Sequence, residues 1–151
     1  MRLTVFSDYA LRVLIYVALQ GERRTTVAEI AEAYNISRSH LMKVVHFLSG
    51  LGYLQTVRGK GGGLTLAQPP DAIRIGTLLR KTEADSVMVE CMGGEGACRI
   101  TEACALPAML ERAVESFFAT LDGYTLADLV TRPQSLKPLF TSVGKNGRKK
   151  L

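Results

Sequence analysis

The stretch that decides the fold reads Thr26-Val-Ala-Glu-Ile-Ala-Glu-Ala-Tyr-Asn-Ile-Ser-Arg-Ser-His-Leu-Met-Lys-Val-Val-His-Phe-Leu48. Thr26 and Glu29 have the spacing of a capping box, which starts a helix that we expect to end before Asn35-Ile36. Ser37 then caps a second helix. Two helices joined by so short a turn predict a helix-turn-helix.

The second of these helices has an apolar side and a polar N-terminal end. Leu41, Val44, Val45 and Leu48 recur at helical spacing and are expected to face the core. The polar end is the part of a recognition helix that meets base edges and phosphates. The residues expected at DNA from this module are Thr26, Ser37, Arg38, Ser39, His40 and Lys43.

A glycine-rich hairpin is predicted directly after these helices. Two short β-type runs flank Arg58-Gly-Lys-Gly-Gly-Gly63. A phosphate-binding P-loop would need Gly-x4-Gly-Lys-Ser/Thr ahead of a helix, whereas strands flank this loop. A hairpin in this position is a wing whose cations suit the DNA backbone or the minor groove, and a solvated turn is the alternative. The wing residues expected at DNA are Arg58, Lys60, Gly61 and Gly62.

A further helix is predicted ahead of this module, from Ser7 to Gln20, and it is apolar on more than one side. Ser7 can cap it. Asp8 then lies in the first turn, where a carboxylate is favoured by the positive end of the helix dipole. Because Pro69-Pro70 closes the module, residues 1–70 are expected to form a winged helix-turn-helix DNA-binding domain within a mainly α fold.

Two helices are predicted downstream of the module. Ile75 to Glu83 reads as a short helix that Gly76 weakens, and a longer helix begins near Pro107. An apolar stripe on the longer helix reaches about 24 Å. We interpret it as a dimer contact, and a core helix of a monomer is the alternative. The stripe consists of Leu106, Leu110, Val114, Phe117 and Leu121.

Charge divides the 151 residues into the same three regions. Residues 1–70 have a balance of +4, residues 71–131 a balance of −5, and residues 132–151 a balance of +6. A basic first region suggests an anionic partner, with nucleic acid the leading candidate. We expect residues 71–131 to hold the cysteines and the dimerisation helix, and residues 132–151 to form a disordered basic tail after a last helical turn at Thr125–Val130.

All three cysteines lie in one short segment, as Cys91, Cys98 and Cys104. An odd number of thiols in a reducing compartment favours metal ligation over disulfides. Zinc and iron–sulfur clusters both accept thiolates, and the spacing does not choose between them. Three buried small hydrophobes are the alternative, against which the glycines between Cys91 and Cys98 argue.

Several classes of protein are disfavoured by the same sequence. No apolar run reaches the roughly 18 residues that a membrane span needs. Asp8 and Arg12 interrupt any signal-peptide core, so we expect an intracellular, cytoplasmic protein. A redox enzyme using the thiols would need a partner constellation such as paired carboxylates or cysteine with histidine, and we find none. We therefore expect no enzymatic activity.

Three motifs together resemble a known family of regulators. They are Met-Arg-Leu-Thr-Val-Phe-Ser-Asp-Tyr-Ala-Leu-Arg-Val-Leu at the start, Val-Arg-Gly-Lys-Gly-Gly-Gly in the wing, and three cysteines ahead of a long helix. In this order they resemble the NsrR group of nitric-oxide-sensing repressors, within the Rrf2 family of winged-helix regulators. The resemblance covers roughly residues 1–130.

The resemblance implies a homodimer that binds double-stranded operator DNA and holds an iron–sulfur cluster on the three cysteines. Nitrosylation of the cluster would release the repressor from DNA. A 4Fe-4S cluster is implied first and a 2Fe-2S cluster second. Asp8 matches the aspartate that supplies the fourth ligand from the other subunit. The related regulator IscR, which senses cluster supply and is the alternative, uses a histidine where this chain has Pro107. The two histidines, His40 and His46, lie on the predicted recognition helix.

Overall fold

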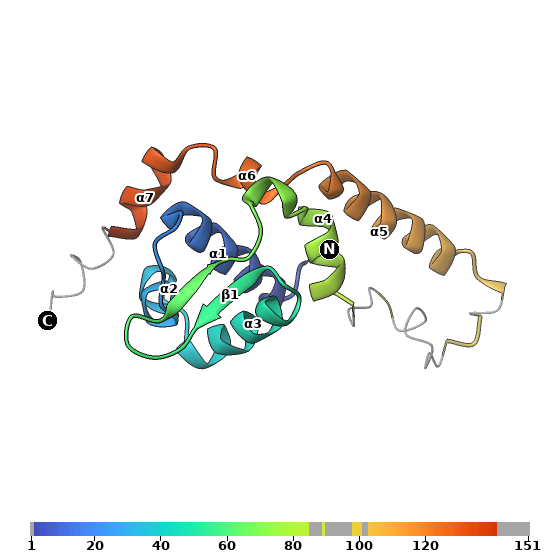
Figure 1. Cartoon of the computed structure of the whole chain (residues 1–151). Coiled ribbons are helices and arrows are strands. Elements are labelled where there is room, and N and C mark those ends of the chain that lie inside the picture. Colours follow the sequence, from blue (N-terminus) through green and yellow to red (C-terminus); the bar gives the residue numbers. More distant parts are fainter. Residues whose placement is uncertain (1, 85–88, 90–97, 101–102, 142–151) are drawn as a thin grey trace, which may run out of the picture.

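The computed structural model of the chain describes residues 2–84, 89, 98–100 and 103–141. In this part of the chain, helices surround one two-stranded hairpin (Figure 1). No helix among the described residues combines the length and apolarity needed to cross a membrane. The elements are α1 (Val5–Gln20), α2 (Val27–Tyr34), α3 (Arg38–Gly50), β1 (Leu54–Val57), β2 (Gly63–Leu66), η1 (Pro70–Ala72), α4 (Ile75–Thr82), α5 (Leu106–Asp122), α6 (Leu126–Leu129) and α7 (Pro133–Thr141).

The predicted helix-turn-helix is confirmed as α2 and α3. The Thr26 hydroxyl accepts the backbone N–H of Glu29 at 3.2 Å, and the Glu29 carboxylate accepts the backbone N–H of Thr26 at 2.6 Å, which completes the capping box. Asn35 ends α2 in a left-handed conformation with φ of 53°. Ser37 caps α3 as predicted, by accepting the backbone N–H of His40.

The predicted wing is confirmed as β1 and β2, which pair antiparallel from Leu54 opposite Leu66 to Val57 opposite Gly63. A further residue joins this hairpin from the segment between α1 and α2. Thr25 exchanges two backbone hydrogen bonds with Leu64, at 3.0 and 2.7 Å. The wing is therefore fixed at its base to the residue that precedes the capping Thr26.

Helix α1 begins earlier than the sequence predicted. Thr4, and not Ser7, caps it, because the Thr4 hydroxyl accepts the backbone N–H of Ser7 at 3.2 Å. Ser7 lies inside the helix and is fully buried, and its hydroxyl bonds instead to Thr82 and Glu83 at the end of α4. A contact with a distant segment has thus displaced the local cap. Asp8 lies in the first turn, as predicted.

One continuous cluster of buried side chains holds the described elements together. Helix α1 lies at its centre and packs against α3, α4, α6 and β2. The apolar side of α3 is buried as predicted, and so are Ile73, Leu78, Leu79 and Leu126 from beyond residue 70. The division at residue 70 stays a prediction, since this cluster crosses it.

Helices α4 and α5 approach each other closely at Gly76. A Cβ atom at Gly76 would meet the backbone of Phe118 and Asp122, with the Asp122 nitrogen at 2.7 Å. The glycine that weakens α4 in isolation is therefore the residue that lets α5 pack on it. From this contact α5 projects away from the winged helix (Figure 1).

The end of the described chain corrects the prediction of a tail without regular structure from Arg132. Residues Pro133–Thr141 form helix α7, and residues 142–151 lie outside the described part. Phe140 packs edge-on against Tyr16 and Tyr34, with ring centroids 5.2 and 5.1 Å apart. Packing of the half-buried Phe140 ring supplies the apolar contact that the charge-based prediction overlooked.

Candidate DNA interface and metal ligands

The predicted DNA-reading residues lie together on the exposed N-terminal end of α3. Ser37, Arg38, Ser39, His40 and Lys43 are all exposed, while the opposite side of the helix is buried. The hydroxyls of Ser37 and Ser39 lie 2.8 Å apart, and the ring of His40 lies beside that of Tyr9 on α1. A row of donors is thus presented outward from a helix whose other face is fixed in the core.

The wing tip carries its two cations outward. Arg58 and Lys60 are exposed, and among the described residues neither has an ion-pair partner. The loop turns tightly at Gly62, whose N–H donates to the carbonyl of Gly59 at 2.9 Å. A Cβ at Gly62 would overlap that same carbonyl oxygen. The glycines therefore shape the loop, and the two cations supply its charge.

One cation that the sequence reasoning missed fastens the wing tip to the helix-turn-helix. Arg24 lies two residues before the exposed Thr26. Its guanidinium Nη1 donates to the carbonyl of Gly61 at 2.9 Å. Together with the Thr25–Leu64 bridge, this bond places wing and α2 start side by side. The sequence signal for it was weak, because the bond spans 37 positions.

Asp8 is held by Arg12, one turn later on α1. Two contacts join them: Arg12 Nε to Asp8 Oδ1 and Arg12 Nη2 to Asp8 Oδ2, each at 3.0 Å. The hydrogen bond that Arg12 donates to the Asp8 carboxylate raises the pKa of Arg12. The guanidinium also lies over the ring of Tyr34, 5.5 Å from its centroid. Both partners remain partly exposed, with 47% of the Asp8 side chain accessible to solvent.

The cysteine segment is described only in part. Cys98 is exposed and Cys104 half-buried, whereas Cys91 lies outside the described residues. For Cys98 and Cys104, the alternative of buried core thiols is therefore wrong. Among the described residues, no three histidine, cysteine or acidic side chains lie close enough to hold a metal ion. The predicted set draws on Cys91 and on Asp8 of another subunit, and its thiolate and carboxylate donors suit an iron–sulfur cluster or zinc.

The apolar stripe of α5 is only partly covered in the single chain, where Leu106 is exposed and the other four stripe residues are half-buried. Phe118 is the one α5 residue described as buried, where it packs under Arg80 of α4. Near the other end of the helix, Leu106 is 47% exposed and Met109 56% exposed. The alternative of a monomer core helix is not supported, because the chain's own core covers only the C-terminal part of α5.

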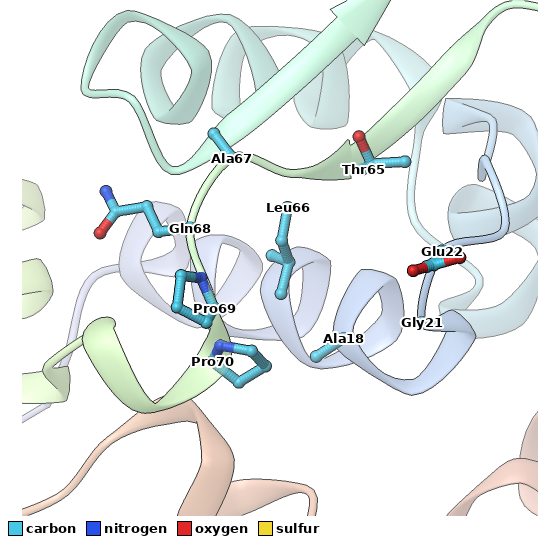
Figure 2. Close-up of a pocket in the computed structure, with 9 residues that line it drawn as sticks. All are labelled: Ala18, Gly21, Glu22, Thr65, Leu66, Ala67, Gln68, Pro69 and Pro70. Atoms are coloured by element: carbon cyan, nitrogen blue, oxygen red, sulfur yellow. The ribbon is translucent and has the colours of Figure 1, made fainter.

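A shallow pocket of about 580 Å³ lies where the end of α1 faces β2 and the following prolines (Figure 2). Among its lining residues only Glu22 carries a charge, and none of the predicted site residues lines it. The lining residues are Ala18, Gly21, Glu22, Thr65, Leu66, Ala67, Gln68, Pro69 and Pro70. The candidate site is therefore the exposed DNA face and the cysteine segment, and not this pocket.

A protein-family model matches most of the chain. The model, named Rrf2 and described as an iron-dependent transcriptional regulator, matches residues 3–132. The chain belongs to the Rrf2 family. The Rrf2 match spans the winged helix, the cysteine segment and α5, and it ends just before α7 begins at Pro133. Helix α7 is thus outside the region that defines the family.

Several solved structures have a similar fold. CymR of B. subtilis, titled the global cysteine regulator, is 27% identical with a TM-score of 0.66, covering 87% of this chain and 97% of that one. The oxidised form of Staphylococcus aureus CymR is also 27% identical, with a TM-score of 0.66 and coverage of 85% and 95%. IscR of T. potens is 23% identical with a TM-score of 0.69, covers 87% of each chain, and supports the fold alone.

The Rrf2 assignment confirms the winged-helix fold and the role of a DNA-binding transcription regulator. It supports the regulator class in place of an enzyme, in line with the sequence reasoning. The similar structures include a cysteine regulator and IscR, so the family by itself does not assign the signal. NsrR is not among these named structures, and the finer assignment rests on the residues of this chain.

Proposed function

We propose that this Rrf2 regulator is a homodimeric, cytoplasmic repressor that senses nitric oxide through a 4Fe-4S cluster. The cluster would be held by Cys91, Cys98 and Cys104, with Asp8 of the other subunit as the fourth ligand. The observation that carries the proposal is the placement of Asp8. Its carboxylate lies on the first turn of α1, half exposed, and pairs with the partly exposed guanidinium of Arg12.

The chemistry of this ligand set suits a sensor of a diatomic gas. When bound, the cluster supplies an iron whose oxygen ligand is more easily replaced than a thiolate. Asp8 would hold that position, and Arg12, which pairs with the carboxylate in the single chain, would hold Asp8 when it is not a ligand. Helix α1 packs on the recognition helix α3. A change in the ligation of Asp8 would therefore alter the position of α3 at the DNA face.

The DNA-binding part of the proposal rests on the two exposed surfaces described above. The polar end of α3 would read base edges in the major groove, while Arg58 and Lys60 of the wing would bind phosphates or the minor groove. To weaken operator binding a hundredfold, the intact and nitrosylated states must differ by about 2.8 kcal/mol in their binding free energy.

The dimer would form along α5. Leu106, Met109 and Leu110 lie toward its N-terminal end, are exposed or half-buried in the single chain, and follow Cys104 directly. Pairing of two such helices would cover this stripe. It would also bring the cysteine segment of one chain toward the other, as ligation by Asp8 across the dimer requires.

A regulator of iron or cluster supply is the second candidate. The description of the family as iron-dependent favours it. Pro107 stands against it, because the resemblance to IscR requires a histidine at that position and proline cannot ligate. The two candidates share the fold, the cluster and the DNA face, and differ in the signal.

Anaerobic purification separates these candidates. We expect brown protein with stoichiometric iron and sulfide, whose cluster absorbance bleaches on addition of nitric oxide while its operator affinity falls in step. Operator affinity that stays unchanged after full nitrosylation would contradict nitric oxide sensing. If affinity then follows only the presence or absence of the cluster, the supply regulator is the better assignment. Zinc without sulfide would exclude both.

A further inference from the structure

Met42 lies on the outer side of the recognition helix α3, where its side chain takes no part in the core. It is 63% exposed. Every other large apolar residue of α2 and α3 is buried or half-buried. A single exposed apolar side chain is common on protein surfaces, so the surroundings of Met42 decide what it can do.

The neighbours of Met42 on the outer side of α3 are polar. Arg38 and His46 stand four residues before and after it, and Ser39 stands three residues before it. This spacing places side chains next to one another on one face of a helix. All three residues are exposed, as is the adjacent Lys43. We call these five residues the outer row of α3, and Met42 is its one apolar member.

The backbone of α3 is held firmly at this point from the opposite side. Leu41, Val44 and Val45 are at most 7% exposed and belong to the core cluster. The Cα atom of Met42 is therefore fixed by its neighbours. The thioether side chain beyond it is unbranched and adapts readily to an irregular surface. Met42 thus presents an adaptable apolar group from a rigid base.

The major groove of DNA offers one apolar group to such a side chain. Among the bases, thymine alone carries a methyl group there, on C5. Polar side chains can bond to phosphates or to the donors and acceptors of any base edge, whereas a thioether is only a weak acceptor. The recognition helix of a helix-turn-helix lies in the major groove. The base contact that suits Met42 is therefore the thymine methyl group.

We propose that Met42 is a specificity-determining residue that reads the C5 methyl group of a thymine in each operator half-site. The inference rests on the proposed function, because it requires the outer row to face the major groove. The residues of this module that the sequence places at DNA are all polar. Met42 would add an apolar contact that tells thymine from cytosine.

Uracil scanning of the operator tests this contact, because deoxyuridine differs from thymidine only in lacking the C5 methyl group. The operator is first selected from random DNA with anaerobic full-length protein. Each thymine of one half-site is then replaced in turn, and the dissociation constant is measured at one fixed salt concentration. For the wild type, we expect at least one replacement to weaken binding about fourfold, the effect of one buried methyl group.

Substitutions at Met42 assign this effect to its side chain. Met42→Ala should bind the thymine and uracil operators equally at that position, because the shortened side chain does not reach the base. Met42→Leu stays apolar and should keep most of the response. Both replacements favour a helix, and the exposed position leaves the core intact.

Lys43→Ala is the matched control, because it removes the neighbouring cation of the outer row and leaves Met42 in place. It should weaken binding to both operators and keep the wild-type ratio between them. A uracil scan without effect on the wild type would overturn the inference. A wild-type response in Met42→Ala would overturn it as well, since another residue would then read the methyl group.

Methylated cytosine provides the reverse test at the same position. Cytosine in place of thymine should weaken binding by the wild type, and 5-methylcytosine should restore part of the loss, because it returns a methyl group to the same place in the groove. In Met42→Ala, the methyl group on cytosine should have no effect. Equal gains in the two proteins would contradict the role of Met42.

These outcomes are distinct from failure of the proposed function. Protein that selects no sequence from random DNA contradicts the DNA-binding role, and the inference with it. Protein that selects an operator but binds it equally well without the thymine methyl groups contradicts only the role of Met42. The nitric oxide response is tested separately, by nitrosylation of the protein on its unmodified operator.

Discussion

The carboxylate of Asp8 and the guanidinium of Arg12 form a two-point ion pair, with both oxygen–nitrogen contacts at 3.0 Å. They stand one turn apart near the start of α1, where they are partly exposed. An exposed pair at this spacing contributes only about 0.3–0.5 kcal/mol to stability. The ion pair therefore matters chiefly because it fixes the position of the Asp8 carboxylate, and not because it stabilises the fold.

Asp8→Ala should retain a cluster on the three cysteines but change its absorbance spectrum and its nitric oxide titration, because the oxygen ligand is lost. Arg12→Ala is the matched control, since it breaks the same ion pair and keeps the carboxylate. Anaerobic spectra of both variants provide the measurement. If the two variants have the same altered spectrum, the ion pair and not ligation is responsible.

We expect substitutions in the wing to change the salt dependence of operator binding. Arg58→Ala and Lys60→Ala should each weaken operator binding and make the slope of log affinity against log salt shallower by about one, because each removes one phosphate contact. Lys81→Ala, whose cation lies over the ring of Tyr53 on another part of the surface, should leave the slope unchanged. A wild-type slope in both wing variants would place the wing tip away from DNA.

Gly76→Ala should destabilise the protein by about 1–3 kcal/mol, because the added methyl group overlaps the backbone of α5 at Phe118 and Asp122. Gly50→Ala is the control. Gly50 lies at the end of α3 with nothing within 4 Å of an added Cβ, and alanine there should be neutral or slightly stabilising. Chemical denaturation measures both, and equal stability of the two variants would mean that α4 and α5 are not packed as described.

We expect the protein to lose stability at high pH because of the buried phenol of Tyr34. Burial raises the pKa of its phenol from 10.0 to about 12. Because the pKa of Tyr34 is higher in the folded state, its neutral phenol contributes to the free energy of unfolding. This contribution is fully present below pH 10 and is lost as the pH rises toward 12. Tyr34→Phe should therefore reduce the fall in unfolding free energy over this range by about 1–2 kcal/mol, allowing for partial exposure.

The aromatic contact with α7 offers a second test at the same residue. Phe140→Ala should increase the exposure of Tyr34 and move its pKa back toward 10, as followed by ultraviolet absorbance of the phenolate. If the titration of the tyrosines is unchanged, then α7 does not cover Tyr34 in solution.

The candidate site was predictable from sequence only where its residues are close together in the chain. The exposed end of α3 and the cations of the wing follow from local motifs. Two hydrogen bonds could not be predicted from local patterns, because they join residues far apart in the sequence. Arg24 donates to Gly61 across 37 positions, and Ser7 donates to Glu83 across 76 positions. Ligation by Cys91, Cys98, Cys104 and Asp8 stays a prediction.

The sequence by itself determined the helix-turn-helix and the hairpin. Their signals are short-range, because a capping box acts over three residues and a hairpin over its turn. Tertiary structure decided the rest. It moved the cap of α1 from Ser7 to Thr4 by engaging Ser7 with Glu83, made Gly76 a packing residue, and formed α7 where charge predicted disorder. In each case, burial against a distant segment outweighed the local preference, since contacts in the core are worth more than a single cap or charge.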